Sequence, residues 1–291
     1  MFDGCMATVV SETSWETREA GENFPVALRL LPRRHREHLH AVYGYARHVD
    51  ELGDSLPGGP AARVAALEDF RAQTRVIWTG GEAASPLLRR LAATVADARL
   101  SEQPFLDLVE ANLQDQRVSR YPTRADLLGY CHLSADPVGR IVLELFGAST
   151  PTRIALSDRV CTALQIVEHL QDVGEDRRAG RVYLPQESLV AYDVDEHALD
   201  ARPAPGVTPP ALRALVLAEA DRAAEMLHEG SALVGQLRGW ARTAVAGFVA
   251  GGLAVVDALH RIDGDVLGQH AAPAKRDVVR HALTALVRGR A

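Results

Sequence analysis

The chain has 291 residues, of which 47% are hydrophobic, and carries a formal net charge of −6 with a pI near 6.0. This length and apolar content exclude a disordered protein, because the chain can bury a large core as one large or two ordinary domains. The negative charge gives no electrostatic footprint for nucleic acid, so we expect no nucleic-acid partner. The 3 cysteines form no Cys-x-x-Cys pair, which indicates neither a disulfide framework nor a zinc site and fits a reducing cytoplasm.

Nearly all of the chain after residue 20 has helical periodicity. Apolar residues recur every three or four positions, as at Leu156, Val160 and Leu164, and alternating β-branched runs are scarce. Breaks rich in proline and glycine then separate predicted helices at 33–53, 60–78, 86–98, 102–117, 123–147, 151–176, 209–237, 240–260 and 274–288. We therefore predict an all-α fold in a single domain over 21–291, preceded by a poorly ordered segment at 1–20.

The N-terminal residues and the most apolar run indicate how the chain meets a membrane. The first twenty residues lack the basic and apolar regions of a secretory signal. The run Ala244 to Val256 is shorter than the roughly 18 to 20 residues that span a bilayer, so we expect a core helix there. We predict a cytoplasmic protein whose membrane contact, if it makes one, is peripheral at the inner face.

Two acidic segments, 50–54 and 172–176, are the strongest functional signal in the sequence. Each places two aspartates at i and i+4, hence on one helix face, where like charges repel by a few tenths of a kcal/mol. A cation offsets this repulsion, and carboxylates without cysteine or histidine suit Mg²⁺ held together with the phosphates of a substrate. The pair therefore predicts a diphosphate site, against the alternative that each segment is a solvated helix face.

The first acidic segment has a fixed cation beside it. Arg47 lies one helical turn before Glu51, so the two side chains share a face with the carboxylates. This arrangement can hold metal and phosphate together, and the plainer interpretation is an intrahelical ion pair.

The second acidic segment extends into a longer column. Glu168, Asp172 and Asp176 follow one another at i, i+4 and i+8, which is costly for a helix without a ligand. Arg181 and Tyr183 come just after the predicted helix end, where they can bind phosphate oxygens. Both acidic segments thus combine carboxylates with a nearby arginine.

At this point the residues resemble a known family. The runs 43–54, 107–147 and 164–185 look like the squalene and phytoene synthase family of head-to-head prenyl synthases, and the resemblance covers about 23 to 290. Family members have an aspartate-rich motif preceded by Tyr and Arg, and a second one followed by Gly-Arg-x-Tyr-x-Pro, which stands here at 180–185. The resemblance implies an isoprenoid-synthase-type helical bundle around a central cavity, Mg²⁺ as the cofactor, and an isoprenoid diphosphate as the substrate.

The resemblance also implies roles for individual residues. The implied metal-binding set is Asp50, Asp54, Glu168, Asp172 and Asp176, and the implied catalytic set is Arg47, Asp54, Asp115, Asp176 and Tyr183. The implied substrate contacts are Tyr43, Arg47, Gln165, Arg181 and Tyr183. Family members commonly have Asn in place of Glu168 and Asp in place of Glu51, so these departures leave the metal affinity open. For Asp115 the alternative is a surface charge.

The substrate's hydrocarbon part needs an apolar channel. Small and apolar positions such as Val138 and Gly139 would line it, with helix packing as the plainer alternative for each. The ring face of Phe24 would stabilise cationic carbons.

Several phrases narrow the resemblance to the bacterial hydroxysqualene synthase branch, which serves hopanoid biosynthesis. They are 22–26, 120–123 and especially 134–140, which reads Ser-Ala-Asp-Pro-Val-Gly-Arg, and Gln171 replaces the arginine usual before the second motif. The implied enzyme is an isoprenoid diphosphate lyase or transferase that takes presqualene diphosphate and water to hydroxysqualene and diphosphate. No nicotinamide is implied, and no Gly-x-Gly-x-x-Gly follows a predicted strand. The alternative is condensation of two farnesyl diphosphates to presqualene diphosphate or squalene.

Two further function classes stay open. The runs 37–40 and 225–228 are both Glu-x-x-His, the ligand pattern of helical di-iron proteins, although such matches also arise by chance. A non-catalytic relative could serve as an assembly module with pathway enzymes as partners. Such relatives usually lose acidic-motif residues, and this chain keeps all four aspartates, which favours an enzyme.

Overall fold

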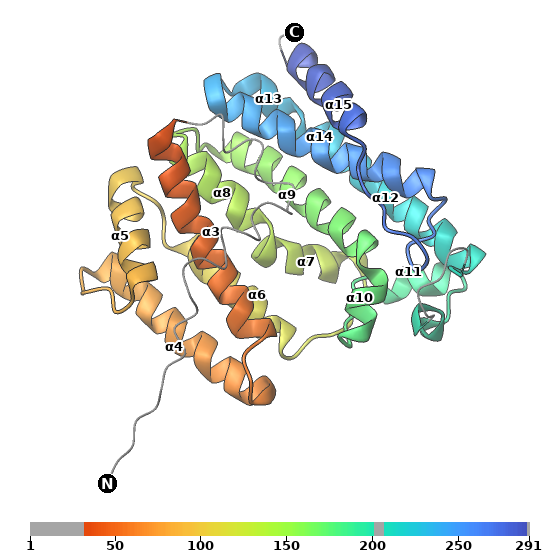
Figure 1. Ribbon diagram of the computed structural model, residues 1–291, viewed down its shortest axis with the longest axis horizontal. Coiled ribbons are helices and arrows are strands. Elements are labelled where there is room, and N and C mark those ends of the chain that lie inside the picture. The colour runs from red at the N-terminus through yellow and green to blue at the C-terminus, as the bar shows by residue number, and fades with distance from the viewer. Residues whose placement is uncertain (1–31, 201–206, 290–291) are drawn as a thin grey trace.

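A computed structural model describes residues 32–200 and 207–289, and within these ranges the chain is built from helices (Figure 1). The only β pairing in the described ranges is an isolated bridge between Arg120 and Val182. The all-α prediction is therefore confirmed. The predicted segment 1–20, its boundary at residue 21, and Phe24 lie outside the described residues.

The helices follow the predicted breaks closely. In chain order they are α3 (Arg33–Asp54), α4 (Gly59–Thr79), α5 (Pro86–Ala98), α6 (Gln103–Asp115), α7 (Arg124–Ser134), α8 (Asp136–Leu145), α9 (Pro151–Gln171), α10 (Val173–Arg178), α11 (Gln186–Ala191), the 3₁₀ helix η1 (Glu196–Asp200), α12 (Pro210–Gly230), α13 (Ala232–Gln236), α14 (Gly239–Arg261) and α15 (Lys275–Arg288). The short elements α11 and η1 were not predicted, because helical periodicity can be recognised only over a longer stretch of sequence.

Three predicted helices are each two helices in the structure. The predicted helix 123–147 breaks at Ala135, because Pro137 in the first turn of α8 lacks the N–H that a continuing helix needs. The helix 151–176 breaks at Asp172, and 209–237 breaks at Ser231. Local periodicity carries through such breaks, so the sequence pattern alone does not show them.

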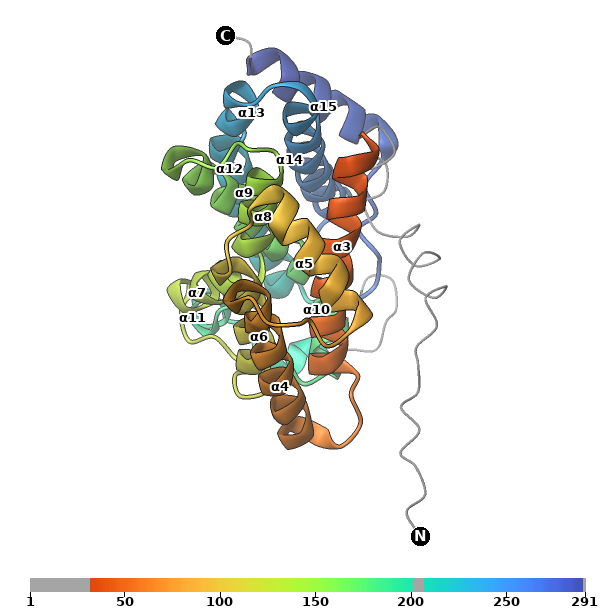
Figure 2. The same cartoon turned by 90° about the vertical axis from the view of Figure 1, so that its left-hand side faces the viewer.

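The centre of the bundle is α9. It packs against α7, α8, α12 and α14, while α3 packs against α4, α5 and α6 (Figures 1 and 2). The buried apolar residues accordingly form two clusters, one around α9, α12 and α14 and one around α3, α5 and α6, with Phe146 packed against both. The end of α3 and the α9–α10 junction, which carry the acidic segments, therefore belong to different halves of the core.

The pairing of α9 with α12 depends on close approach at Gly230. A Cβ at this position would lie 2.6 Å from Val160 Cγ2 and 3.0 Å from the carbonyl oxygen of Leu156. Since the second neighbour is backbone, the helices could admit a larger residue only by moving apart.

The predicted core helix around Ala244 to Val256 is α14. Within the described ranges it is the one helix long and apolar enough to cross a membrane, and 67% of its most apolar window is buried inside the fold. Val245, Val249 and Leu253 lie in the core cluster. The extent to which α14 is buried is typical of a core helix, as the sequence predicted.

We expect Gly230→Ala to lower the free energy of unfolding by about 1 to 3 kcal/mol, because the methyl group has no room between α12 and α9. The matched control is Gly251→Ala, since a Cβ there meets nothing within 4 Å and alanine favours a helix. Urea denaturation of both variants measures the difference. Equal midpoints for the two variants would show that α12 and α9 do not meet as closely as described.

Candidate active site

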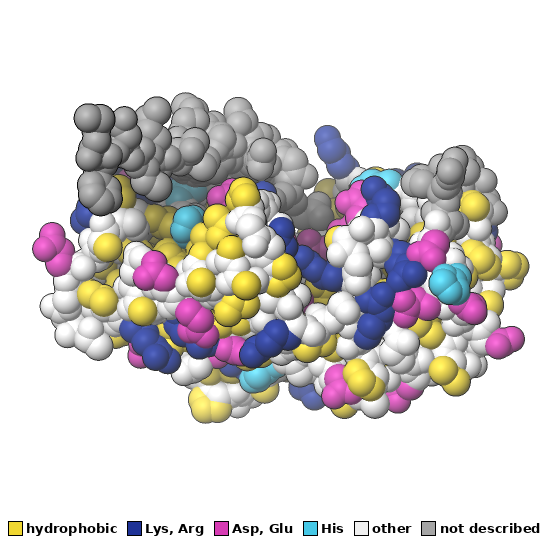
Figure 3. Space-filling model, turned by 90° about the horizontal axis from the view of Figure 1, so that it is seen from below, with side chains coloured by type: hydrophobic (Ala, Val, Ile, Leu, Met, Phe, Trp, Pro, Cys, Tyr) yellow, Lys and Arg dark blue, Asp and Glu magenta, His cyan; other side chains and the backbone are white. Residues whose placement is uncertain are grey.

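A cavity of about 300 Å³ lies between the end of α3, α6, α7 and the α9–α10 junction. We call it the acidic cavity. Its lining residues are Asp50, Asp54, Leu108, Ala111, Asn112, Asp115, Tyr130, Ser134, Gln165, Glu168, His169, Asp172, Asp176, Arg181 and Tyr183. All five predicted metal-binding residues are in this set, together with Asp115, Gln165, Arg181 and Tyr183. Figure 3 shows the molecule from below, with acidic side chains set back in the middle of the face and Lys or Arg side chains on both sides.

The last turn of α3 supplies two of these carboxylates, from Asp50 and Asp54. Gly53 between them lets α6 come close, because a Cβ there would lie only 2.2 Å from the side-chain oxygen of Asn112. Asn112 then donates to Asp50 at 3.2 Å, and Gln116 donates to the carbonyl of Gly53 at 3.0 Å. The glycine in the first motif is therefore a contact point between α3 and α6.

The α9–α10 junction supplies three more carboxylates, from Glu168, Asp172 and Asp176. Although α9 ends at Gln171, the N–H of Asp172 still donates to Glu168 and the N–H of Asp176 donates to Asp172, at 3.0 and 2.8 Å. The spacing of one turn thus continues through the break. All three side chains consequently reach the same cavity.

Negative charge in the cavity exceeds what the chain itself neutralises. Desolvation raises the pKa of Asp50 to about 6, with further upward contributions from Asp54 and Glu168 that Asn112 and Arg47 partly oppose. The pKa of Asp172 is also raised, by desolvation and then by Asp176 and Glu175. Glu168 acts on Asp50 across the cavity, so the two motifs share one electrostatic site. Oxygen donors with uncompensated charge fit a hard divalent cation.

Arg181 joins the two acidic segments. Its guanidinium donates to Asp54 at 2.5 Å, across 127 positions of the chain. Desolvation opposes the charged form, but the hydrogen bond to Asp54 and the neighbouring Tyr183 raise the pKa of Arg181 above its ordinary value. This arginine therefore stays charged beside the carboxylates and is placed to meet an anionic ligand.

Asp115 is the centre of an aromatic cluster at the cavity wall. Its carboxylate accepts from the hydroxyl of Tyr130 at 2.8 Å and from that of Tyr183 at 3.3 Å. Desolvation raises the pKa of Asp115 to about 6, against the hydrogen bond from Tyr130 and the charge of Arg181. His169 stacks on Tyr183 with ring centroids 3.7 Å apart. Asp115 is thus a half-buried cavity residue and not a surface charge.

A second, separate cavity of about 80 Å³ lies between α8, α9, α13 and α14 and is apolar. It is lined by Val138, Gly139, Val142, Leu143, Ser157, Val160, Cys161, Leu164, Leu233, Val245 and Phe248. A Cβ at Gly139 would lie 2.4 Å from Ser157 Oγ and 2.5 Å from Cys161 Sγ, so this glycine packs α8 against α9 and also lines the cavity. Neighbouring residues of α9 face different cavities, since Leu164 lines the apolar one and Gln165 the acidic one.

Two predicted substrate contacts on α3 are not among the residues that line either cavity. Arg47 lies 3.6 Å from Glu51, in the intrahelical ion pair that was the plainer interpretation, and both side chains are partly exposed. Tyr43 lies one turn earlier on the same helix. Arg47 still acts on the site at a distance, because its charge lowers the pKa of Asp50.

Sequence reasoning did not assign a role to Asn112 or His169. Asn112 is recognisable only from the close approach of α6 to Gly53. His169 follows Glu168 directly, and its ring faces Tyr183 while Nδ1 lies 3.6 Å from Asp176. Both contacts join different helices or segments, so no local pattern reveals them.

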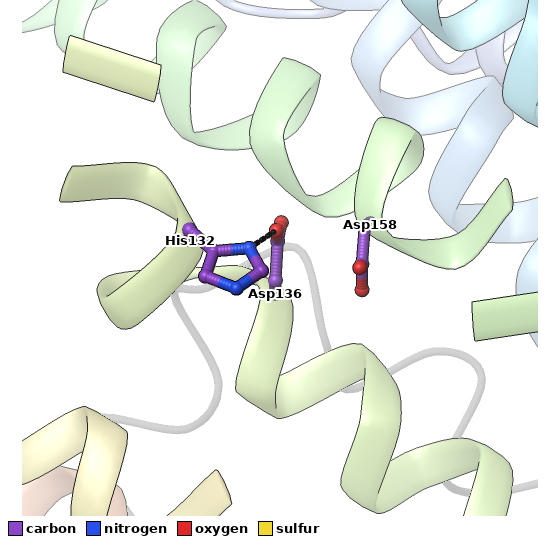
Figure 4. A group of neighbouring side chains, drawn as sticks. All are labelled: His132, Asp136 and Asp158. Atoms are coloured by element: carbon purple, nitrogen blue, oxygen red, sulfur yellow. Dashed lines mark hydrogen bonds and ion pairs between the residues drawn. The ribbon is translucent and has the colours of Figure 1, made fainter. Parts of the chain in front are cut away.

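A separate group of side chains, His132, Asp136 and Asp158, has ligand atoms within 4.8 Å of one another (Figure 4). Asp136 is buried and accepts from Thr162 at 2.8 Å, and His132 Nδ1 lies 3.0 Å from it. Arg140 binds both carboxylate oxygens of Asp158, at 3.1 and 2.8 Å, so an arginine already supplies the cation. We interpret this cluster as a set of charged contacts that holds α7, α8 and α9 together.

Among the described residues this is the single group of three or more His, Cys, Asp or Glu side chains whose ligand atoms come within 4.8 Å of one another, and no three carboxylates of the acidic cavity do so. Neither Glu-x-x-His run belongs to it. Glu37 pairs with Arg33 at 2.7 Å, and Glu225 and His228 are exposed on α12. The structure thus gives no support to the di-iron hypothesis.

Comparison with known proteins gives consistent matches. Residues 17–279 match the family model described as squalene/phytoene synthase. The hydroxysqualene synthase of Zymomonas mobilis subsp. mobilis is 37% identical over 173 residues, which are 58% of this chain and 57% of that enzyme. The presqualene diphosphate synthase of the same organism is 30% identical over 188 residues, 62% of this chain and 63% of that enzyme. Both alignments span less than two thirds of the relative's length.

A solved structure is similar over more of the chain. The crystal structure of squalene synthase HpnC from Alicyclobacillus acidocaldarius superposes with a TM-score of 0.77 and 36% sequence identity, covering 86% of this chain and 92% of that chain. The likeness includes sequence as well as fold.

We expect Asp136→Asn to change how stability depends on pH. Desolvation, with the nearby Asp158, raises the folded-state pKa of Asp136 from 3.8 to about 6. The folded protein therefore holds this proton more tightly than the unfolded chain, and the stabilisation present below about pH 4 is lost as the pH rises to about 6. The unfolding free energy of the wild type should fall relative to that of the variant over this range, by at most about 1.4 kcal/mol per pH unit.

Urea denaturation at several pH values measures this difference. Asp221→Asn is the control, because Asp221 is exposed on α12 and pairs only with the surface residue His260. Parallel curves for the wild type and Asp136→Asn would contradict the raised pKa.

Proposed function

The chain belongs to the squalene/phytoene synthase family of isoprenoid biosynthetic enzymes, and we propose that it converts presqualene diphosphate and water to hydroxysqualene and diphosphate. In this reaction the carbon–oxygen bond to diphosphate breaks, the oxygen of water bonds to the rearranged carbocation, and a water proton is released. No electron donor is consumed. The observation that carries the proposal is that α9 lines both an acidic and an apolar cavity, which suit the two ends of an isoprenoid diphosphate.

We infer that Mg²⁺ is the cofactor and that Asp50, Asp54, Glu168, Asp172 and Asp176 would hold it. The donors are all oxygen, and the pKa values of Asp50 and Asp172 are raised by desolvation first and then by neighbouring carboxylates, a cost that a bound cation would relieve. When bound, the metal would stabilise the charge that develops on the departing diphosphate.

Arg181 would bind the diphosphate directly. Its guanidinium is held between the two motifs by Asp54, in a partly buried place where a charge-assisted hydrogen bond is strong. Tyr183 and Asp115 would fix the wall beside it, since their hydroxyl and carboxylate are already bonded to each other. Gln165 would contact the substrate from α9, where it lines the acidic cavity next to Leu164 of the apolar one.

The apolar cavity, with a volume of about 80 Å³, would hold part of the hydrocarbon. Val138 and Gly139 on α8 face Leu164 and neighbouring residues of α9, and none of these side chains carries a charge. An apolar enclosure keeps bulk water from a carbocation, so capture by a single water is favoured over random quenching. For Tyr43 and Arg47 we propose contacts at the approach to the cavity, from their position on α3 ahead of Asp50.

Two observations favour this step over condensation of two farnesyl diphosphates. Among the described residues, Arg181 is the single arginine that lines the acidic cavity, which suits one diphosphate group better than two. Gln171, where the family commonly has arginine, donates to the carbonyl of Ala271 at 2.7 Å and so ties α9 to the segment before α15. Unlike an arginine, Gln171 adds no positive charge to the second acidic segment. We further propose that the enzyme acts in the cytoplasm.

Replacing Arg181 with alanine should lower kcat/KM for presqualene diphosphate by on the order of tenfold to a thousandfold, because a charge-assisted contact to the leaving group is lost. Steady-state kinetics of the purified variant measures the effect. Arg159→Ala is the matched control, since Arg159 lies on α9 but pairs with Glu229 at the surface, at 2.9 Å. Unchanged turnover in Arg181→Ala would remove this arginine from the mechanism.

Product analysis tests the reaction itself. Presqualene diphosphate with Mg²⁺ alone should give hydroxysqualene and diphosphate, NADPH should not alter the product, and a chelator should abolish turnover until Mg²⁺ is restored. Parallel incubations with farnesyl diphosphate are the comparison. Efficient conversion of farnesyl diphosphate alone, or diversion to squalene by NADPH, would assign the condensing reaction instead, and no turnover of either substrate would favour a non-catalytic relative.

A further inference from the structure

The helix α15 presents apolar side chains to solvent. Val279, Leu283 and Val287 are 58%, 60% and 67% exposed, and their i, i+4, i+8 spacing places them in one row, which we call the α15 stripe. An amphipathic helix of a globular protein normally turns such a row toward the core. Here the row faces outward, so the helix has an apolar face without a partner in the described part of the chain.

The opposite side of α15 is fixed to α14, so this orientation is set by the fold. Asp277 bonds to Arg261 at 2.6 Å, and His281 lies 2.8 Å from Asp257. Near the other end, Arg242 donates to the carbonyl of Leu286 at 2.7 Å. These contacts along three turns hold the α15 stripe on the outside of the molecule, at the end opposite α4 (Figures 1 and 2).

Positive charge surrounds the α15 stripe. The helix contains Lys275, Arg276, Arg280 and Arg288; Arg276 is 82% exposed, whereas Arg280, at 59% exposed, already pairs with Asp257 of α14. Its one acidic residue, Asp277, is turned toward α14 with 13% exposure. A surface that is basic and apolar at once, on a chain with net charge −6, is complementary to an anionic apolar boundary.

An exposed tryptophan lies at the end of α14 that neighbours the end of α15. Trp240 begins α14 and is 43% exposed. Arg242, two residues later, bonds to Leu286, so the start of α14 lies beside the end of α15. Tryptophan is enriched at membrane–water interfaces, where its apolar ring and N–H suit the headgroup region.

We propose that the α15 stripe, with its basic flank, docks in the plane of an anionic lipid bilayer. The helix would lie at the interface with its three aliphatic side chains below the headgroups and with Lys275 and Arg276 among the lipid phosphates. A bilayer fits better than a folded protein partner, because three side chains on one convex helix fall short of the roughly 800 Å² per partner of a stable protein interface. The α15 stripe lines neither cavity and does not depend on the proposed reaction, whose hydrocarbon product would also enter a bilayer.

Vesicle co-sedimentation of the full-length protein tests the proposal. The protein should bind phosphatidylcholine vesicles that contain phosphatidylglycerol and bind vesicles of phosphatidylcholine alone much more weakly. Raising the salt concentration should weaken binding, because screening reduces the attraction between arginines and phosphates. No binding to the anionic vesicles at low salt would overturn the proposal.

Variants separate the two components of the surface. The triple change Val279→Ser, Leu283→Ser and Val287→Ser should lower the partition coefficient by about tenfold or more, since most of the inserted apolar area is lost. Lys275→Glu with Arg276→Glu should remove the preference for anionic lipid. Val190→Ser is the matched control, because Val190 is 80% exposed on α11, away from α15, and should bind as the wild type does.

Two controls make the result decisive. Far-UV circular dichroism and turnover should be unchanged in the triple serine variant, because its three residues line neither cavity. Sedimentation velocity without lipid should show the same mass for the wild type and this variant. Equal vesicle binding by the two proteins, or a wild-type dimer that the variant loses, would overturn the proposal, and the second outcome would assign the stripe to a second copy of the chain.

Discussion

Mutual repulsion among six carboxylates around one cavity is the constraint that the surrounding helices must withstand. Asp54 is offset by Arg181, and Asp50 and Asp115 are each held by a neutral hydrogen-bond donor, Asn112 and Tyr130. The pKa values of Asp50, Asp115 and Asp172 are nevertheless raised, by desolvation first and by repulsion from neighbouring carboxylates second, so these contacts do not fully offset the cost of ionising the three groups. A site of this kind is costly for the free protein and is suited to a ligand that brings positive charge.

Close packing around α9 holds the acidic segments in place despite the repulsion between their carboxylates. The contact of Gly230 on α12 with the backbone of α9 fixes one side of that helix, and the charged cluster of Asp136, Arg140 and Asp158 fixes α8 on another. The break at Asp172 then redirects the chain without losing the spacing of one turn between the carboxylates. Because α9 is held on several sides, the second acidic segment is kept opposite the first, despite the repulsion between them.

The same helix separates two environments that the proposed chemistry requires. Gln165 faces the acidic cavity and Leu164 the apolar one, so one residue step along α9 passes from a charged region to a hydrocarbon-like region. Ionisation of a diphosphate is favoured where cations gather, and a carbocation persists where water is scarce. The family to which the chain belongs is consistent with this division, and the match to the structure from Alicyclobacillus acidocaldarius extends over most of both chains.

The sequence by itself determined the helical class, most helix boundaries and the two acidic motifs, because periodicity and i, i+4 spacing are local properties of the chain. Only the tertiary structure decided what those motifs meet. Asn112 reaches Asp50 because α6 crosses α3 at Gly53, and His169 stacks on Tyr183 because the chain turns back after α10. The same holds for α15, since spacing predicted the helix, whereas ion pairs to α14 decided that its apolar row faces outward. Such contacts join residues far apart in the chain, and their energies depend on packing that no local pattern records.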